Sequence, residues 1–421
     1  MKWDRVYVTT LFTFSWKKII EAIDFAKLVV KDISGLYVGG IAASLNPEML
    51  AKETDLVVGR NIIPGLLDRP GILDANEIVI DELTPDYSIL DEVSYCYPRG
   101  DGYLAYTTKG CTRQCSFCAV PTLEPVYKPR ISIKKQIQEV EKAYGPRRNL
   151  ILMDNNVLGS PNFPEIIAEI LEIGFTKDAK LHHRRRFVDF NQGLDCRYID
   201  EEKIRLLSQL PIRPMRIAFD HLGLQEKYEN AVRLADKYGI YELSNYLLFN
   251  YQDRPEELWE RMKINIDLNR ELTANIYCFP MKYAPVRGEE AKSRSYIGSH
   301  WNRKYLRAIQ CIINVTKGVV TTNNPLFFAR AFGESLTEYF EILMMPEEYI
   351  FHRDHFDENG ETERWREQYQ NLNREERQEA ENLIHNHLFS CNDTTSKAVL
   401  EFLKHYQTNY RSEKLCKEVG K

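Results

Sequence analysis

Apolar and polar residues alternate along the first part of the chain in a way that predicts parallel α/β structure. Residues 6–12 form a short apolar and β-branched run, typical of a strand, and residues 16–30 carry apolar side chains at helical spacing. Residues 36–40 and 55–59 predict two further strands, and Pro47 opens a short helix between them. Strands that alternate with helices indicate a small α/β unit with a parallel sheet.

Six further alternations of strand and helix follow between residues 103 and 285. The predicted strands cover residues 103–108, 150–153, 187–190, 214–219, 243–249 and 275–279. Helical patterns such as 201–210 and 256–268 lie between them. Most of these strands end in polar residues, and ligand sites in parallel α/β folds collect at the carboxyl ends of the strands. The site is therefore expected at that edge.

After residue 285 the pattern becomes mainly helical. Residues 301–315 form an amphipathic helix, and residues 324–330 begin another. Residues 361–386 are highly charged and predict one long helix with a solvated face. Residues 412–421 predict a frayed tail.

Composition bounds the class of protein. The chain has 421 residues, 43% hydrophobic and 28% charged, which is ordinary for a soluble globular protein. It contains no apolar run of membrane-spanning length and no signal-peptide pattern, so a cytoplasmic protein without a membrane partner is expected. The formal net charge of −5 disfavours a general nucleic-acid binder.

Three cysteines within eight residues, Cys111, Cys115 and Cys118, are the clearest chemical signal. Clustered thiols in an intracellular protein indicate a metal, and zinc is one alternative. A structural zinc site normally has four ligands, however, and no second pair follows. Nine cysteines, an odd number, also disfavour a disulfide framework. The spacing therefore favours an iron–sulfur cluster. The other cysteines are isolated and are expected to be small buried residues: Cys96, Cys196, Cys278, Cys311, Cys391 and Cys416.

This C-x3-C-x2-C run, with Phe117 before its third cysteine, resembles the signature of the radical S-adenosylmethionine (SAM) superfamily. The resemblance implies a 4Fe–4S cluster with three irons bound by cysteine and the fourth open to the amino and carboxylate groups of SAM. It implies reductive cleavage of SAM to a 5′-deoxyadenosyl radical that abstracts hydrogen from a substrate, here unknown. It also implies an oxygen-sensitive enzyme, a reductant such as flavodoxin or ferredoxin, and a partial (β/α)6 TIM-like barrel in residues 96–286.

The same resemblance suggests which residues contact the cofactor. The candidates are Phe117, Asp154, Asn155, Asn156, Asn191, Gln192, Asp195, Arg216 and Asn250. The group after the second core strand is expected at the SAM amino group, and the group after the third at the ribose hydroxyls. Arg216 is expected at the SAM carboxylate, since a guanidinium matches a carboxylate in fork geometry. An Asp or Asn at a strand end is also commonly a turn former or helix cap. No catalytic residue is assigned.

Residues 1–95 resemble a truncated cobalamin-binding, Rossmann-like domain of B12-binding radical SAM proteins. The D-x-H-x-x-G motif of those domains has no counterpart here, and no histidine precedes His182. A domain that only packs on the core is therefore favoured over one that binds cobalamin. A cobalamin-dependent radical SAM methyltransferase remains the alternative function, and a non-catalytic iron–sulfur interaction protein is the alternative from another class. A methylthiotransferase is disfavoured, because only Cys96 lies upstream of the cysteine run.

Residues 287–421 are expected as a mainly helical lid over the site, because radical chemistry needs shielding from water. Residues 349–356 mix aromatic and charged groups and are the expected contact segment, with His352 and His355 as metal-ligand candidates that lack a third partner. This composition favours a small polar molecule or a peptide as substrate. The basic run 182–186 is expected as a solvated loop, with a bound anion as the alternative.

Overall fold

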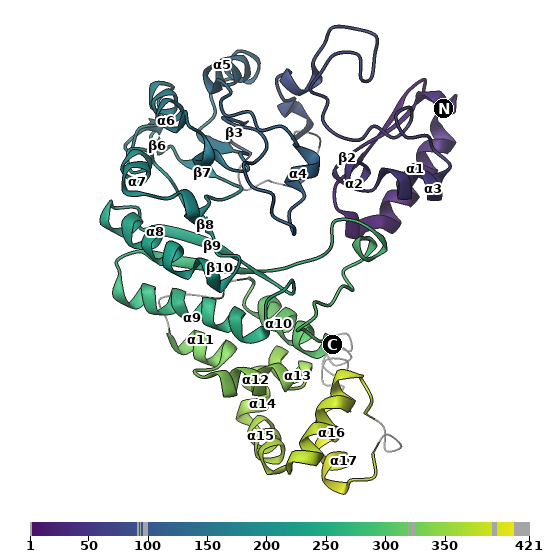
Figure 1. Ribbon diagram of the computed structural model, residues 1–421, viewed down its shortest axis with the longest axis vertical. Helices are drawn as coiled ribbons and strands as arrows, with labels where there is room; N and C mark the ends of the chain where they lie inside the picture. The colour runs from purple at the N-terminus through teal and green to yellow at the C-terminus, as the bar shows by residue number, and fades with distance from the viewer. Residues whose placement is uncertain are drawn as a thin grey trace.

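The computed structural model describes residues 2–90, 92, 94–95, 100–318, 320, 325–389 and 394–407. Cys96, Cys391, Cys416 and the predicted tail at 412–421 lie outside the described residues. The chain is a mixed α/β protein with parallel sheets, followed by a helical C-terminal region (Figure 1). No helix within the described ranges is both long and apolar enough to cross a membrane.

The N-terminal unit is a two-stranded parallel sheet with helices packed on it. Its elements are β1 (Val6–Thr10), α1 (Trp16–Val29), β2 (Leu36–Gly40), α2 (Ile41–Leu45) and α3 (Pro47–Thr54). The apolar face predicted for α1 is buried, with Ile23 and Ala26 almost inaccessible to solvent. These residues pack with Leu36 and Val38 of β2 in a separate hydrophobic core.

The strand predicted at residues 55–59 does not form. The chain turns at Gly59, whose φ is +80°, and Val58 makes only an isolated bridge with Ile62. The Asn61 side chain holds this turn by donating to the carbonyls of Ile33 and Leu36. In place of a third strand, Ile62 forms a single parallel bridge with Val38 of β2.

Two parallel three-stranded sheets make up the central part. The first contains β3 (Gly102–Ala105), β4 (Asn149–Leu152) and β7 (Val188–Phe190), and the second contains β8 (Met215–Ala218), β9 (Glu242–Phe249) and β10 (Asn275–Lys282). All six coincide with predicted strands, with shifted ends. Leu194, in the segment after β7, forms an isolated parallel bridge with Ile217 of β8. Within each sheet the strands lie side by side in chain order.

Helices connect these strands, as the sequence pattern predicts for parallel neighbours. They are α5 (Ile133–Tyr144), α6 (Phe163–Glu172), α7 (Glu201–Leu207), α8 (Gln225–Lys237) and α9 (Pro255–Glu271), while the short α4 (Val120–Leu123) follows the cysteines. The basic run forms an antiparallel hairpin rather than a loop. Its strands are β5 (Lys180–Leu181) and β6 (Arg184–Arg185), and both central residues, His182 and His183, have positive φ.

The C-terminal region is a set of short helices. They are α10 (Arg303–Val315), α11 (Pro325–Phe332), α12 (Leu336–Met344), α13 (Glu347–Phe351), α14 (Arg353–Glu358), α15 (Glu361–Asn371), α16 (Arg374–His385) and α17 (Lys397–Leu403). The single helix expected over residues 361–386 is two helices, because Asn373 caps the second in a capping box with Glu376. Each has an exposed face, as expected, and an opposite face that is buried at Trp365 and Ile384.

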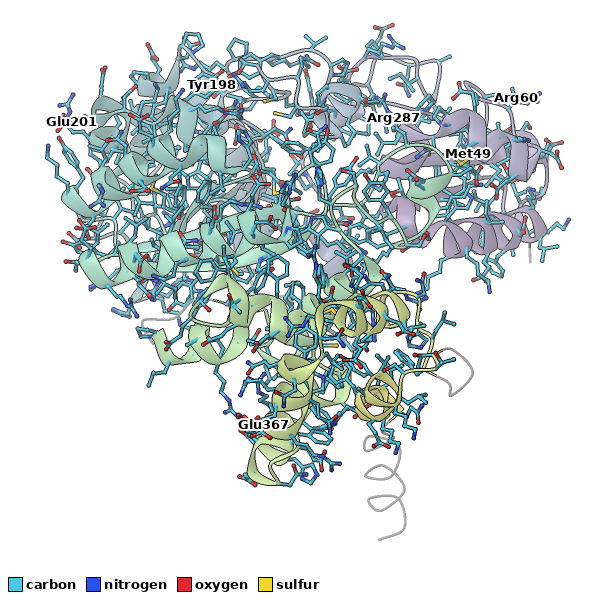
Figure 2. The ribbon with its side chains drawn as sticks, turned by 60° about the horizontal axis from the view of Figure 1, so that its bottom comes forward. Met49, Arg60, Tyr198, Glu201, Arg287 and Glu367 are labelled. Atoms are coloured by element: carbon cyan, nitrogen blue, oxygen red, sulfur yellow. The ribbon has the colours of Figure 1, made fainter. Side chains whose placement is uncertain are left out.

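The C-terminal helices share their hydrophobic core with the central sheets. One continuous cluster of buried residues runs from Tyr87 through both sheets to Leu403. Helices α11 and α12 pack against α9 (Figure 1), where the Trp259 indole donates to the Phe332 carbonyl at 3.1 Å. Side chains fill the space between the C-terminal helices and the central sheets (Figure 2). Arg287 lies between the N-terminal unit and the central part in the same view.

Candidate functional site

The three cysteines lie in the loop between β3 and α4, and the end of β4 anchors the start of this loop. Oδ1 of Asp154 accepts hydrogen bonds from the backbone and hydroxyl groups of both Thr107 and Thr108. Asp154 is 3% exposed, and this burial raises the pKa of its carboxyl to about 6. Gly110 is required at the next turn, because its φ is +73° and a Cβ there would lie 2.8 Å from the Val126 carbonyl.

Each cysteine sulfur faces a nitrogen donor. Cys111 Sγ accepts from the backbone of Arg113 at 3.3 Å and from the Asn156 side chain at 3.4 Å, and Cys118 Sγ accepts from the backbone of Val120 at 3.5 Å. Such donors stabilise thiolates that bind iron.

The third sulfur, that of Cys115, lies within hydrogen-bond reach of the Arg197 guanidinium. Burial raises the pKa of the Cys118 thiol, so that thiol keeps its proton until a metal replaces it.

Among the described residues, two buried acceptors beside this loop have no donor. They are Oδ2 of Asp154 and Oδ1 of Asn156, which project from the segment after β4. Asn155, between them, donates instead to Glu124 at 2.8 Å. Buried acceptors are normally satisfied, so two orphaned oxygens next to three thiols fit a ligand that brings N–H donors. An ammonium group, with three donors, meets that requirement.

The residues predicted at the next strand ends are mostly engaged within the protein. Asp195 pairs with Arg197 through both carboxylate oxygens, at 2.7 and 2.8 Å. Arg216 pairs in the same way with buried Asp189, at 2.9 and 3.1 Å. Asn191 Nδ2 lies 3.9 Å from a methionine sulfur. Of this group, Gln192 is exposed to solvent.

Asn250 holds a segment across the site rather than offering its amide outward. Its side chain is fully buried, donates to the carbonyls of Tyr283 and Tyr296 at 3.1 and 3.2 Å, and accepts from the Gly298 backbone at 2.8 Å. Residues 283–298, which we call the strap, are thereby fixed at the carboxyl end of β9. Both N–H groups of the amide and one lone pair of its oxygen are used in these bonds.

Aromatic rings join the strap to the cysteine loop. Phe117 meets Tyr251 edge-on at 5.8 Å between ring centroids, and Tyr251 contacts Tyr283 at 4.7 Å. The Tyr251 hydroxyl lies 2.7 Å from the Ser116 hydroxyl. Tyr251, Tyr283 and Arg197 are not among the site residues predicted from the sequence. Tyr251 and Arg197 were within reach, because each lies one or two residues from a predicted contact.

The N-terminal unit contacts the site through the strap and α4. Asn46 donates to the Val286 carbonyl and accepts from the Gly288 backbone, both at 3.0 Å. Arg287 donates to Thr122 of α4, and α2 packs on the same helix. Since α2 directly follows β2, the carboxyl edge of the small sheet lies beside the helix that ends the cysteine loop.

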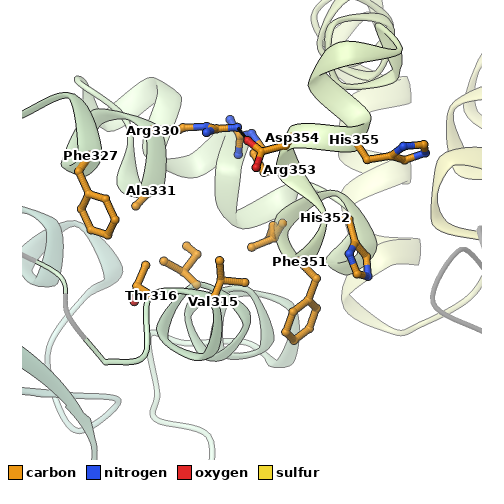
Figure 3. A pocket seen from close by; sticks show the side chains of 12 residues that line it. Val315, Thr316, Phe327, Arg330, Ala331, Phe351, His352, Arg353, Asp354 and His355 are labelled. Carbon is orange, nitrogen blue, oxygen red and sulfur yellow. Dashed lines mark hydrogen bonds and ion pairs between the residues drawn. The ribbon is translucent and has the colours of Figure 1, made fainter. Parts of the chain in front are cut away.

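The segment expected to contact the site lies within the C-terminal helices. Tyr349 is buried, stacks on Phe356 at 4.1 Å and hydrogen-bonds His405 at 2.7 Å. Residues 350–355 line a cavity of about 390 Å³ between α10, α11 and α14, with Arg330 paired to Asp354 at its rim (Figure 3). The contacts that hold this segment are thus with its own helical region. The strap, rather than residues 349–356, lies against the cysteine loop.

Across the described ranges, no three His, Cys, Asp or Glu side chains are arranged around a single metal ion. His352 and His355 therefore gain no third partner of that kind. A cubane cluster differs from a single ion, because three cysteines bind three different irons and need not converge on one point. The lack of a single-ion site among the described residues therefore does not argue against a cluster at the cysteine loop.

No sequence model of a protein family matches the chain, and no curated protein matches it. Several solved structures are similar to it, among them the following three. TsrM from Kitasatospora setae, a radical SAM methyltransferase with cobalamin and a 4Fe–4S cluster bound, is 17% identical with a TM-score of 0.42 over 74% of this chain and 65% of TsrM. Two further similar structures are of the cobalamin-dependent radical SAM enzyme OxsB.

OxsB without ligands is 14% identical, with a TM-score of 0.43 over 62% of this chain and 43% of that one. OxsB with aqua-cobalamin and SAM is 12% identical, with a TM-score of 0.49 over 98% and 72%. These neighbours are cobalamin-dependent radical SAM enzymes. They belong to the superfamily that the cysteine run resembles, and the chain spans less than two thirds of the first two. Because all three TM-scores are below 0.5, these similarities carry no argument about function. The function of this chain is therefore inferred from its own residues.

Proposed function

We propose that this chain is a radical SAM enzyme in which Cys111, Cys115 and Cys118 bind a site-differentiated 4Fe–4S cluster. One observation carries the proposal: three thiols, each facing a nitrogen donor, lie beside two buried oxygens that have no donor among the described residues. These oxygens are Asp154 Oδ2 and Asn156 Oδ1. The six parallel strands would form the partial (β/α)6 barrel, with this site at their carboxyl ends.

Asp154 and Asn156 are proposed to accept hydrogen bonds from the SAM ammonium group. When bound, the cluster and SAM supply a carbon-centred radical that no side chain can generate. The buried Asp154 carboxylate would gain a positive partner there, which offsets the cost of its burial. An external reductant such as flavodoxin or ferredoxin would supply the electron.

Several predicted cofactor contacts are proposed to position the site rather than to touch SAM. Asp195 orients Arg197 toward Cys115, the Arg216–Asp189 pair joins the two sheets, and Asn250 fixes the strap. Asn191 and Gln192 remain the candidates for the ribose hydroxyls, and Phe117 for ring contact. The strap and its tyrosines are proposed to exclude water on one side, as radical chemistry requires.

Anaerobic reconstitution tests the cluster. The full-length protein should become brown and give an EPR signal, after reduction, that changes when SAM is added. Cys111→Ala should lose the intact cluster, whereas Cys278→Ala, which removes a buried thiol from β10, should keep it. Colourless protein with stoichiometric zinc would contradict the proposal. Formation of 5′-deoxyadenosine with reductant and SAM separates an enzyme from a non-catalytic iron–sulfur protein.

Hydrogen abstraction without cobalamin is the first candidate reaction, and a cobalamin-dependent methyl transfer is the second. The second is favoured by one observation: the carboxyl edge of β1 and β2 lies next to α4 and the cysteine loop. TsrM and OxsB both bind cobalamin, which makes it the second cofactor to test. An absorbance titration with hydroxocobalamin decides, since tight stoichiometric binding would favour methyl transfer. The substrate is proposed to be a small polar molecule or a peptide.

A further inference from the structure

A second cavity in the C-terminal region has the composition of an anion site. It has a volume of about 420 Å³ and lies between the first turn of α10, the start of α13 and the end of α16. Three basic side chains of α10, Arg303, Lys304 and Arg307, line it together with His385 and His387. The size suits a small organic ligand rather than a macromolecule.

Lys304 is the unusual member of this set, because its ammonium group is buried and Glu347, the carboxylate that acts on its charge, is already paired with Arg307. The residue is 7% exposed, and its Nζ donates to the Met345 carbonyl at 2.7 Å. Among the described residues, no carboxylate lies within 4.0 Å of that nitrogen. An ammonium has three donors, and a lone buried cation is costly. Burial lowers the pKa of Lys304 to about 8.

Of the two acidic side chains that line the cavity, Glu347 is already engaged. It is held by Arg307, whose Nε lies 3.0 Å from its Oε1 and whose Nη2 donates to Oε2. Glu348 Oε2 lies 3.8 Å from the His352 ring and has no hydrogen-bond partner among the described residues. Neither carboxylate lies within 4.0 Å of Lys304 Nζ, so an anion from outside the described residues would be its first close counter-charge.

His385 supplies a second group for such an anion. Its Nε2 is buried and has no hydrogen-bond partner in the described part of the chain, while its ring packs edge-on against Tyr305 at 5.5 Å. Because both Lys304 Nζ and His385 Nε2 belong to one cavity, a single oxyanion between them would satisfy both. The N-terminus of α10 adds a favourable dipole at the same place.

We propose that this cavity binds the carboxylate or phosphate group of a small organic anion between Lys304 and His385. Arg303 and His387, both exposed, lie on the same lining and would draw the anion in. The site is separate from the cysteine loop and does not depend on the iron–sulfur proposal. It gives the C-terminal helices a ligand of their own.

Calorimetric titration of the full-length protein at constant ionic strength tests the proposal, with inorganic phosphate in one arm and succinate in the other. Saturable binding in either arm is expected, and the arm that saturates identifies the anion class. Lys304→Met should weaken that binding at least tenfold, because it keeps the length of the side chain but removes the charge. Lys17→Met, on a fully exposed lysine of α1, is the matched control and should bind as the natural chain does.

His385→Phe provides an independent variant, since it keeps a ring against Tyr305 and removes Nε2. It should also weaken binding at least tenfold while leaving the melting temperature near that of the natural chain. The proposal is overturned if neither phosphate nor succinate binds saturably. It is equally overturned if the affinity is unchanged in both variants.

Discussion

Arg197 places a permanent positive charge against one of the three thiols that are proposed to bind the cluster. Its guanidinium donates to both oxygens of Asp195 and lies within hydrogen-bond reach of Cys115. Hydrogen bonds and nearby charge at the sulfurs set the potential of an iron–sulfur cluster. Because reduction adds negative charge, a cation beside a ligand favours the reduced form.

Replacing Arg197 by Gln should therefore lower the midpoint potential of the cluster without removing it. An EPR-monitored redox titration of the reconstituted protein measures the shift, and the iron content confirms that the cluster remains. Arg205→Gln, on an exposed arginine of α7, is the control and should leave the potential unchanged. A variant with full iron content and an unaltered potential would show that Arg197 has only a structural role.

The same residues show what sequence patterns can and cannot predict. The cysteine spacing and the polar strand ends correctly located Asp154 and Asn156 beside the loop, because strand order fixes which ends are neighbours. The pairing of Arg216 with Asp189 could not be predicted in this way. Both residues lie in strands that the sequence predicts. Whether their side chains meet depends on which face of each strand they occupy, and the sequence does not specify this.

At the scale of elements, the Arg216–Asp189 pair joins β8 to β7, where the two three-stranded sheets meet. The exposed fractions of the two side chains are 13% and 1%, so the pair is almost removed from water. Breaking such a pair leaves one buried charge without a partner, which typically costs about 3–5 kcal/mol. Removing both charges costs less, because no unpaired charge remains.

We therefore expect Arg216→Met to lower the free energy of unfolding by about 3–5 kcal/mol. The double variant Arg216→Met with Asp189→Leu should recover part of that loss. Urea unfolding followed by circular dichroism measures both values. An equal or larger loss in the double variant would mean that the pair is not what joins the two sheets.

The predicted strands of the two central sheets are all observed, whereas two predicted elements elsewhere differ from the structure. All six central strands were predicted, because each contains apolar residues that are buried in the shared core. The strand expected at 55–59 is replaced by a turn in which the backbone N–H groups of Asn61 and Ile62 donate to the Val57 carbonyl. The helix expected at 361–386 is interrupted because Asn373 caps a new one. Both interruptions are local hydrogen bonds that hydrophobic periodicity does not register.

At the scale of the whole molecule, the buried residues form two cores of different extent. One is confined to residues 16–62, and the other is continuous from Tyr87 to Leu403. A C-terminal region that served only as a cover would have a core of its own. Here Trp259 of α9 and Phe328 of α11 belong to one packed surface, with ring centroids 6.3 Å apart. A domain division after residue 286 is therefore a proposal about function, and the packing is continuous across it.

Two deletions distinguish these cores. A chain that ends at residue 301 would expose the apolar surface of α9 to water, and it should lose cooperative unfolding and fail to retain iron after reconstitution. A chain that begins at residue 83 removes a unit with a separate core, so it should unfold cooperatively and still bind the cluster. Circular dichroism during urea titration and iron analysis measure both outcomes. If the chain ending at residue 301 folded and held iron as well as the full-length protein, the C-terminal helices would be a detachable cover, as the sequence had suggested.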